Sequence, residues 1–448
     1  MIARKAEKYI KKWIHESNKA LLVNGARQVG KTFTVRKCLV DEKANFLEIN
    51  LLERPEIVPL IEKSRNVDDF IINVSAITNY SFVPRETIVF IDEVQEVPDV
   101  VTRIKFWVDD ARFKFVLSGS LLGIELNNLR SVPVGYLSEL TMYPLDFEEF
   151  LLASGVTDDT VSYLKKCFAK HQPVGESINQ VMMEHFRRYL VVGGMPDAVR
   201  EYISSGNISD VAHIQENIIE LYKKDFTKYE QQEKKLSLVS LYNLMPAELL
   251  RQNKRFNYAD IKKGLKFERI ESSFLWLKSA GVVITTYKAT EPRVSLKQNE
   301  KSSFFKMYSS DVGLLTCQYG SAMKAAILAD DKKINLGGIY ENAVAQELHA
   351  HGFDSYYYNS HSLGELDFII EENMHVVPIE VKSGKDYTVH SALDKVVKNA
   401  EYEVEKAYVF ANCDVTEDDK FLYMPIYMCA FVSDEVELPI LKPINVTI

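Results

Sequence analysis

One short glycine-containing motif constrains the fold of this chain more than any other feature. Gly25-Ala-Arg-Gln-Val-Gly-Lys-Thr32 matches the pattern G-x-x-x-x-G-K-[ST] between an expected strand, Ala20–Asn24, and an expected helix, Lys31–Val40. Glycine permits backbone conformations that a Cβ atom forbids, so such a turn can aim several N–H groups at phosphate oxygens. A strand, this turn and a helix together predict a nucleotide-binding α/β domain.

The motif also assigns chemistry to individual residues. We expect ATP to contact Gly25, Ala26, Arg27, Gln28, Val29, Gly30, Lys31, Thr32 and Phe33. Lys31 can neutralise the β- and γ-phosphates, and the Thr32 hydroxyl is a ligand for Mg²⁺. A chance match in an ordinary strand–helix turn is the alternative, and the strand–helix context argues against it.

Further apolar runs extend the expected parallel sheet. They lie at Asn45–Asn50, Thr87–Asp92, Phe113–Ser118 and Tyr136–Tyr143, with a helix between the middle two at Val97–Ala111. Because helices alternate with these strands, the pattern predicts a sheet covered on both faces. Residues 150 to 220 then form a helical pattern that is broken at Val192-Gly-Gly-Met-Pro196.

Polar residues follow two of the expected strands. Thr87–Asp92 ends in adjacent carboxylates about 60 residues after the glycine-rich turn. We expect Asp92 to hold Mg²⁺ through water and Glu93 to polarise the attacking water as a general base. Ser118 follows the next strand and is a candidate for sensing the γ-phosphate or positioning the water, although a plain strand-terminal turn would have the same sequence.

A second group of acidic residues lies in the last quarter of the chain. Asp367 and Glu380 are 13 residues apart on consecutive expected strands, and Lys382 shares one strand face with Glu380. Together with Glu341 on an upstream helix, they resemble the E, D and E-x-K arrangement of PD-(D/E)xK nucleases. In that arrangement Asp367 and Glu380 bind Mg²⁺, Lys382 stabilises developing charge, and Glu341 completes the metal shell. A purely structural Lys–Glu pair is the alternative.

The middle of the chain is basic, although the whole chain has a net charge of −9. Residues 221–306 contain 18 Lys and Arg against 9 Asp and Glu. The expected order of helix (258–263), helix (268–278) and strand (282–288) fits a winged helix. The candidate contacts to nucleic-acid phosphates are Lys254, Arg255, Lys262, Lys263, Lys266 and Arg269. Exposed lysines on a helix or a protein contact would give the same composition.

Several segments taken together resemble the AAA-type ATPases of bacteria and archaea that carry a DUF4143 region. The segments are Gly25–Thr32, Asp92–Gln95, Ser118–Ser120, Tyr143–Phe150, Gly193–Pro196, Tyr222–Phe226, Tyr308–Leu315 and Tyr340–Asn342. The resemblance implies an AAA-like α/β core, a winged-helix segment and a C-terminal fold related to restriction endonucleases. Relatives often have a basic residue after the glycine at 135, where this chain has Tyr136, so Arg130 or Arg27 would have to replace it.

The resemblance and the composition together predict four domains in the 448 residues. They are an AAA-like P-loop domain (1–150), a helical linker or lid (151–220), a winged-helix-like basic segment (221–330) and a nuclease-like α/β domain (331–448). We expect an Mg²⁺-dependent ATPase coupled to a module that binds or cuts DNA, with an oligomer compatible with the family. The alternative is an ATP-driven switch that binds a protein partner and carries an inert nuclease-like domain.

Composition indicates a cytoplasmic protein. The five cysteines, at positions 38, 167, 317, 413 and 429, form no C-x-x-C pair and favour reduced core thiols over disulfides or zinc ligands. The basic N-terminus has no apolar run after it, and we find no stretch long enough for a transmembrane helix. We therefore expect no association with a membrane.

Overall fold

The computed structural model describes residues 2–120, 135–228, 232–251, 254–257 and 270–434. The described residues pack into two compact units. The first unit comprises residues 1–162, 184–285 and 306–346, and the second comprises residues 163–183, 286–305 and 347–448. Each unit is built from separate chain segments, and the division into four consecutive domains stays a prediction.

A five-stranded parallel sheet forms the centre of the P-loop region. Its order is β2-β3-β4-β1-β5. The strands are β1 (Ala20–Asn24), β2 (Asn45–Asn50), β3 (Thr87–Asp92), β4 (Lys114–Ser118) and β5 (Leu137–Thr141). All neighbouring pairs are parallel, which confirms the predicted α/β class and the five predicted strands.

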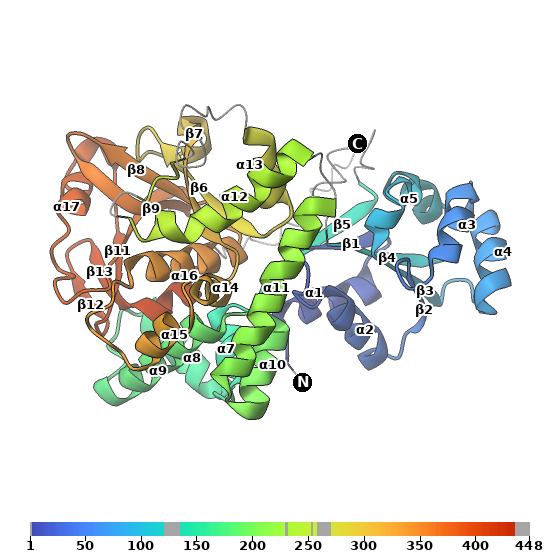
Figure 1. Cartoon of the computed structure of the whole chain (residues 1–448), viewed down its shortest axis with the longest axis horizontal. Coiled ribbons are helices and arrows are strands. Elements are labelled where there is room, and N and C mark those ends of the chain that lie inside the picture. Colours follow the sequence, from blue (N-terminus) through green and yellow to red (C-terminus); the bar gives the residue numbers. More distant parts are fainter. Residues whose placement is uncertain (1, 121–134, 229–231, 252–253, 258–269, 435–448) are drawn as a thin grey trace, which may run out of the picture. The chain divides into compact units, whose positions relative to one another are not determined.

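Helices cover this sheet, as its buried strands require. They are α1 (Lys5–Glu16), α2 (Lys31–Asp41), α3 (Val58–Lys63), α4 (Val67–Thr78) and α5 (Asp99–Asp110). Helices α1 and α2 lie beside each other (Figure 1). Ile61, Phe70 and Trp107 of α3, α4 and α5 share one apolar core with alternate strand residues such as Leu22 and Ile91. Burial of this face fixes the strand ends at which the predicted site residues lie.

A helical region follows the sheet in the chain. It contains α7 (Phe147–Ala153), α8 (Asp158–Ala169), α9 (Glu176–Val192), α10 (Pro196–Ser205), α11 (Ile208–Lys228) and α12 (Gln232–Leu249). The predicted helical pattern and its break after residue 192 are confirmed. Pro196 opens α10 at a position where proline lacks only an N–H that would be unsatisfied anyway.

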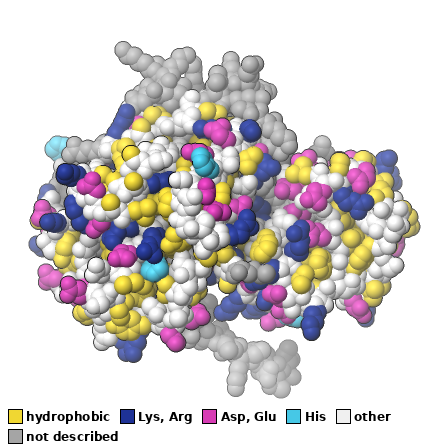
Figure 2. Space-filling model, turned by 60° about the horizontal axis from the view of Figure 1, so that its bottom comes forward, with side chains coloured by type: hydrophobic (Ala, Val, Ile, Leu, Met, Phe, Trp, Pro, Cys, Tyr) yellow, Lys and Arg dark blue, Asp and Glu magenta, His cyan; other side chains and the backbone are white. Residues whose placement is uncertain are grey.

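The basic middle window continues with α13 (Glu271–Ser279), β6 (Val283–Ala289) and β7 (Glu300–Ser309). These elements confirm the second predicted helix and the predicted strand. The first predicted helix, at 258–263, lies outside the described residues, so the winged helix stays a prediction. On the face shown in Figure 2, basic and acidic side chains are interspersed.

The C-terminal part is a mixed α/β structure, as predicted. Its eight-stranded sheet has the order β12-β13-β11-β10-β9-β8-β6-β7. The strands not yet given are β8 (Tyr356–Ser360), β9 (Gly364–Glu372), β10 (His375–Val381), β11 (Ala407–Ala411), β12 (Thr416–Asp418) and β13 (Phe421–Pro425). The helices in this stretch of the chain are α14 (Val312–Gln318), α15 (Ser321–Leu328), α16 (Gly337–Ala350) and α17 (Ser391–Val397).

Strand direction changes across this sheet. Strand β10 is antiparallel to β9 but parallel to β11, which is also parallel to β13. Leu393 of α17 packs into the core formed by Leu366, Ile369, Val409 and Tyr423. Among the described residues, no helix is both long and apolar enough to span a membrane.

Candidate functional site

The P-loop joins β1 to α2 in a conformation that requires glycine at both ends. Gly25 has φ +135° and Gly30 has φ +93°, and both values are unfavourable for residues with a Cβ atom. A Cβ atom on Gly25 would lie 2.1 Å from the backbone oxygen of Met142, just beyond β5. The sheet therefore determines the position of the loop as well as its shape.

Lys31 is buried at the first turn of α2. Its Nζ donates to the backbone oxygens of Gly25 at 3.0 Å and Ala26 at 2.8 Å, so the ammonium group is held by the loop itself. Burial lowers the pKa of Lys31 to about 8, although the carboxylates of Glu93 and Asp92 act in the opposite direction. The loop thus holds a cation that is costly to bury without an anion.

Thr32 and Asp92 meet at the ends of two different elements. The Thr32 hydroxyl donates to Asp92 Oδ2 at 2.8 Å, and the Asn50 amide donates to the same oxygen at 3.1 Å. Burial raises the pKa of Asp92, while its hydrogen bond with Thr32 opposes the rise. Two oxygen groups that suit Mg²⁺ therefore lie together next to the P-loop.

Glu93 follows β3 in a left-handed conformation with φ +57°. Its Oε2 accepts a hydrogen bond of 2.5 Å from the Gln95 amide. Ser118, at the end of β4, is completely buried, whereas Ser120 lines the cavity beside the P-loop. The role of Ser118 stays a prediction, and Ser120 is a second serine at this strand end.

Arg4 is a contact of the P-loop that the sequence did not reveal. Its guanidinium donates to the Val29 oxygen at 2.9 Å, to the Tyr143 oxygen at 2.7 Å and to Glu149 Oε1 at 3.1 Å. The planar arginine group suits several fixed acceptors at once. Arg4 therefore ties the loop to the segment after β5.

Arg27 connects the P-loop to α11. Its guanidinium donates to Asp225 Oδ1 at 2.6 Å, and the Tyr222 hydroxyl donates to the Arg27 backbone oxygen at 3.0 Å. Gly281 also approaches the loop, because a Cβ atom there would lie 3.2 Å from the Ala26 nitrogen. Arg130, the other predicted arginine, lies outside the described residues.

A cavity of about 680 Å³ opens beside the P-loop. Its lining is Ile2, Arg4, Arg27, Gln28, Gly30, Lys31, Thr32, Phe33, Thr34, Glu93, Ser120, Pro196, Asp197, Arg200, Ile203 and Ser204. The volume lies within the range of small-molecule sites. The cavity brings the predicted loop residues together with Glu93, and it adds residues of α10 that the sequence did not indicate.

The structure also brings the C-terminal acids onto neighbouring strands. Strands β9 and β10 pair Phe368 with Ile379, and Asp367 Oδ2 accepts from the Val381 N–H at 2.9 Å. Lys382 Nζ lies 2.7 Å from Glu380 Oε1. The predicted sharing of a strand face by Glu380 and Lys382 therefore appears as an ion pair.

Glu341 is buried within the first unit and is surrounded by its own partners. Its carboxylate forms an ion pair with Lys254, lies 3.9 Å from Lys306 Nζ and accepts from the Tyr308 hydroxyl at 3.2 Å. Lys254, predicted to contact nucleic acid, is thus engaged with Glu341, while Arg255 is exposed. The other four predicted nucleic-acid contacts, Lys262, Lys263, Lys266 and Arg269, lie outside the described residues.

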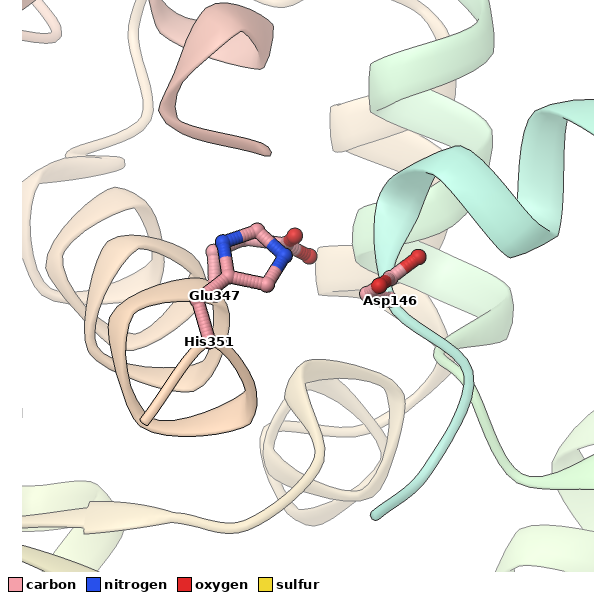
Figure 3. Close-up of side chains that lie close together, drawn as sticks. All are labelled: Asp146, Glu347 and His351. Atoms are coloured by element: carbon pink, nitrogen blue, oxygen red, sulfur yellow. The ribbon is translucent and has the colours of Figure 1, made fainter. Parts of the chain in front are cut away.

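Three other potential metal ligands are drawn in Figure 3, which shows Glu347 and His351 at the end of α16 and Asp146 at the start of α7. In the first unit, Asp146 caps α7 by accepting from the Glu149 N–H at 2.8 Å. In the second unit, His351 Nδ1 lies 2.9 Å from the backbone oxygen of Val432. Asp146 and His351 therefore already have structural contacts.

Comparisons with known proteins agree with this geometry. Residues 17–151 match the family described as an AAA domain. Residues 183–324 match DUF8612 and residues 336–428 match DUF4143, both described as domains of unknown function. The fold and the P-loop thus define an AAA-type P-loop protein. More narrowly, the chain carries an AAA domain followed by a C-terminal DUF4143 region, and the AAA domain supports ATP binding and ATPase activity in general.

Solved structures show weaker similarity. The Walker-type ATPase PABY2304 of Pyrococcus abyssi is 15% identical over 71% of this chain and 96% of its own, with a TM-score of 0.44. PCH-2 of C. elegans is 12% identical over 46% of this chain and 65% of its own, with a TM-score of 0.27. A katanin structure is 16% identical over 34% of this chain and 55% of its own, with a TM-score of 0.24. The comparison with curated proteins finds no significant match. Because these TM-scores are below 0.5, the family matches and the P-loop carry the assignment.

Proposed function

We propose that this chain is an Mg²⁺-dependent ATPase that controls a C-terminal module acting on DNA. The observation that carries the ATPase proposal is the 2.8 Å bond between Thr32 and Asp92 beside the buried Lys31. These groups lie next to one cavity large enough for a nucleotide. A cytoplasmic location and assembly into an oligomer remain predictions.

Each group has a distinct task in this proposal. Lys31 leaves the two loop carbonyls and pairs with the β- and γ-phosphates, while the N–H groups of the loop bind phosphate oxygens. Thr32 and Asp92 would hold Mg²⁺, which neutralises phosphate charge when it is bound. Glu93, released from Gln95, accepts a proton from the attacking water as the general base.

The C-terminal acids support the DNA-directed part of the proposal. Asp367 and Glu380 lie on adjacent antiparallel strands with Lys382 beside Glu380, which fits the E-x-K arrangement of the nuclease-like fold. Asp367 and Glu380 would hold a divalent cation, and Lys382 would stabilise charge on the scissile phosphate. Glu341 is left out of this metal shell, because two lysines and a tyrosine already surround it.

A second candidate function is an ATP-driven switch that binds a protein partner and carries an inert nuclease-like region. The short ion pair between Lys382 and Glu380 favours this candidate, because it neutralises the carboxylate without a metal ion. The contact between Lys254 and Glu341 favours it as well, because it removes one basic group from the predicted nucleic-acid surface.

The deciding experiment measures phosphate release and strand cleavage by the full chain, with Mg²⁺ and ATP, in the presence and absence of duplex DNA. Faster phosphate release with DNA, or cleavage that Asp367→Ala abolishes while ATP hydrolysis persists, supports the DNA-directed function. The exposed Asp386→Ala is the matched control. Hydrolysis that is indifferent to DNA, without cleavage, favours the protein switch, and no hydrolysis under any condition refutes both.

A further inference from the structure

Two hydrogen bonds reach the backbone of the P-loop from segments outside the AAA match. Arg4 Nη1 donates to the Val29 oxygen at 2.9 Å, and the Tyr222 hydroxyl donates to the Arg27 oxygen at 3.0 Å. The AAA match covers residues 17–151, so Arg4 precedes it, whereas Tyr222 of α11 follows it. Both donors bond to backbone carbonyls of the loop, so they act on its conformation.

Each of these bonds fixes the direction of a whole peptide group. The peptide bonds of the loop are trans, and in a planar trans peptide the N–H points opposite to the C=O. The carbonyl held at Arg27 therefore turns the Gln28 N–H to the side away from its donor. The carbonyl held at Val29 does the same for the Gly30 N–H. Gln28 and Gly30 both line the cavity beside the P-loop.

The backbone at these two positions needs such support. Gln28 has φ +66° and Gly30 has φ +93°. A residue with a Cβ atom rarely adopts the left-handed conformation of Gln28, which persists where surrounding contacts determine it. Successive N–H groups in a turn of this kind form a concavity that binds anions. The bond from Tyr222 acts on the peptide group that leads into this strained residue.

We propose that Arg4 and Tyr222 are positioning residues for phosphate binding. Each holds one loop carbonyl so that the next N–H, that of Gln28 or Gly30, faces the triphosphate. The proposal rests on the proposed function, because it assigns these N–H groups to the phosphates of ATP. A loop that already has its binding conformation loses less entropy when the ligand arrives, which raises affinity.

Both side chains are themselves held in place. The Arg4 side chain is 7% exposed, and its Nη2 and Nε donate to the Tyr143 oxygen at 2.7 Å and to Glu149 Oε1 at 3.1 Å. Tyr222 is buried, and burial raises the pKa of its phenol, so the hydroxyl remains a donor at neutral pH. A donor that is fixed by packing and by other bonds can determine the position of a backbone group.

The test measures dissociation constants of ATP and of inorganic tripolyphosphate, both with Mg²⁺, by calorimetry on the full chain. Tyr222→Phe removes only the hydroxyl, whereas Arg4→Lys keeps the positive charge beside Glu149 but cannot reach three acceptors at once. Each variant should weaken both ligands by about fivefold, the effect of one lost hydrogen bond. The loss should be equal for the two ligands, because the loop N–H groups bind phosphate alone. Tyr222→Phe, which keeps the buried ring, decides the outcome if Arg4→Lys does not fold.

Matched controls break the same kinds of bond elsewhere in the first unit. The Tyr319 hydroxyl donates to the Pro246 oxygen at 2.8 Å, and Arg103 of α5 donates to the oxygens of Glu62 and Ser64 around the end of α3. None of these five residues lines the cavity. Tyr319→Phe and Arg103→Lys should therefore lower the midpoint of urea unfolding about as much as the test variants do, while they bind both ligands as the parent does.

A spectroscopic measurement separates positioning from a loss of stability. Valine labelled with ¹³C at the carbonyl and glycine labelled with ¹⁵N select the five Val–Gly pairs of the sequence, one of which is Val29-Gly30. The signal that disappears in Val29→Ala is that of Gly30. At saturating tripolyphosphate the Gly30 amide proton should move downfield in the parent, because a bond to phosphate deshields it, and should move less in Arg4→Lys.

The possible failures are distinguishable. If Tyr222→Phe and Arg4→Lys lose no more affinity than the two controls, the positioning role is refuted and the ATPase proposal survives. An equal displacement of the Gly30 signal in Arg4→Lys and the parent refutes the role of Arg4. A loss of affinity for ATP but not for tripolyphosphate refutes the positioning role as well, because the effect then lies at the base or sugar. If the parent binds neither ligand, the proposed function fails too.

Discussion

The pH dependence of ATP binding directly tests the charge state of Lys31 in the P-loop. Without nucleotide, burial lowers the pKa of this lysine to about 8. A bound triphosphate places negative charge beside the ammonium group and raises its pKa again. Binding is therefore strongest below pH 8, where Lys31 is already charged, and weakens as the pH rises through 8, because the lysine must then take up a proton.

The size of the effect follows from the fraction of charged lysine. With a pKa of about 8, that fraction falls about 25-fold between pH 7.5 and pH 9.5, which corresponds to ~1.9 kcal/mol of binding free energy. Calorimetry of Mg-ATP binding across this range measures the change in affinity. Repeating it in buffers with different ionisation enthalpies measures proton uptake.

A non-titrating variant provides the control. Lys31→Met keeps the length of the side chain without its charge, so its weak affinity should not change with pH. The parent and the variant should approach each other near pH 9.5. Equal affinity of the parent at pH 7.5 and 9.5, with no proton uptake, would refute the depressed pKa and the role given to Lys31.

Three further perturbations test other parts of the structure. Glu93→Gln should retain ATP binding and slow single-turnover hydrolysis by roughly 10²-fold, and an unchanged rate would remove Glu93 as the base. Gly25→Ala forces a Cβ atom toward the Met142 oxygen and should abolish ATP binding, whereas Gly206→Ala, with φ +67° and open space, should cost only about 1 kcal/mol in urea unfolding. Burial raises the pKa of Asp311 to about 6, so its contribution to stability falls as pH rises from about 4 to 6, by up to about 3 kcal/mol. Urea unfolding at pH 4 and pH 7 should show this loss of stability in the parent and not in Asp311→Asn. Identical pH profiles for the two proteins would contradict the raised pKa of Asp311.

The sequence predicted those parts of the fold that depend on local patterns. Thr87–Asp92 is a continuous apolar and β-branched run and forms β3 with the same bounds. The glycines and Lys31 of the P-loop have a fixed spacing that is typical of phosphate-binding turns, so a short window contains the whole signal. Polar residues at the ends of strands could likewise be recognised, because parallel strands end at one edge of the sheet.

The contacts that complete the site have no local pattern. Arg27 and Asp225 form an ion pair across 198 residues, and Arg4 reaches the P-loop from before the first strand. The break at Gly193–Pro196 was visible in the sequence, but nothing in it indicated that α10 lines the cavity. Such contacts depend on how helices pack, and packing is set by shape complementarity among residues that are distant in the chain.

The order of strands in the five-stranded sheet has a consequence for synthesis of the chain on the ribosome. Strand β1 comes first in the sequence but pairs with β4 and β5, and the Met142 N–H donates to the Asn24 oxygen at 2.9 Å. These two residues are 118 positions apart, which takes about 6 to 24 s at typical rates of translation. Until β4 is complete at Ser118, 94 residues after Asn24, the apolar strand that leads into the P-loop has no partner strand on either side, so the nascent chain exposes edges that chaperones can bind.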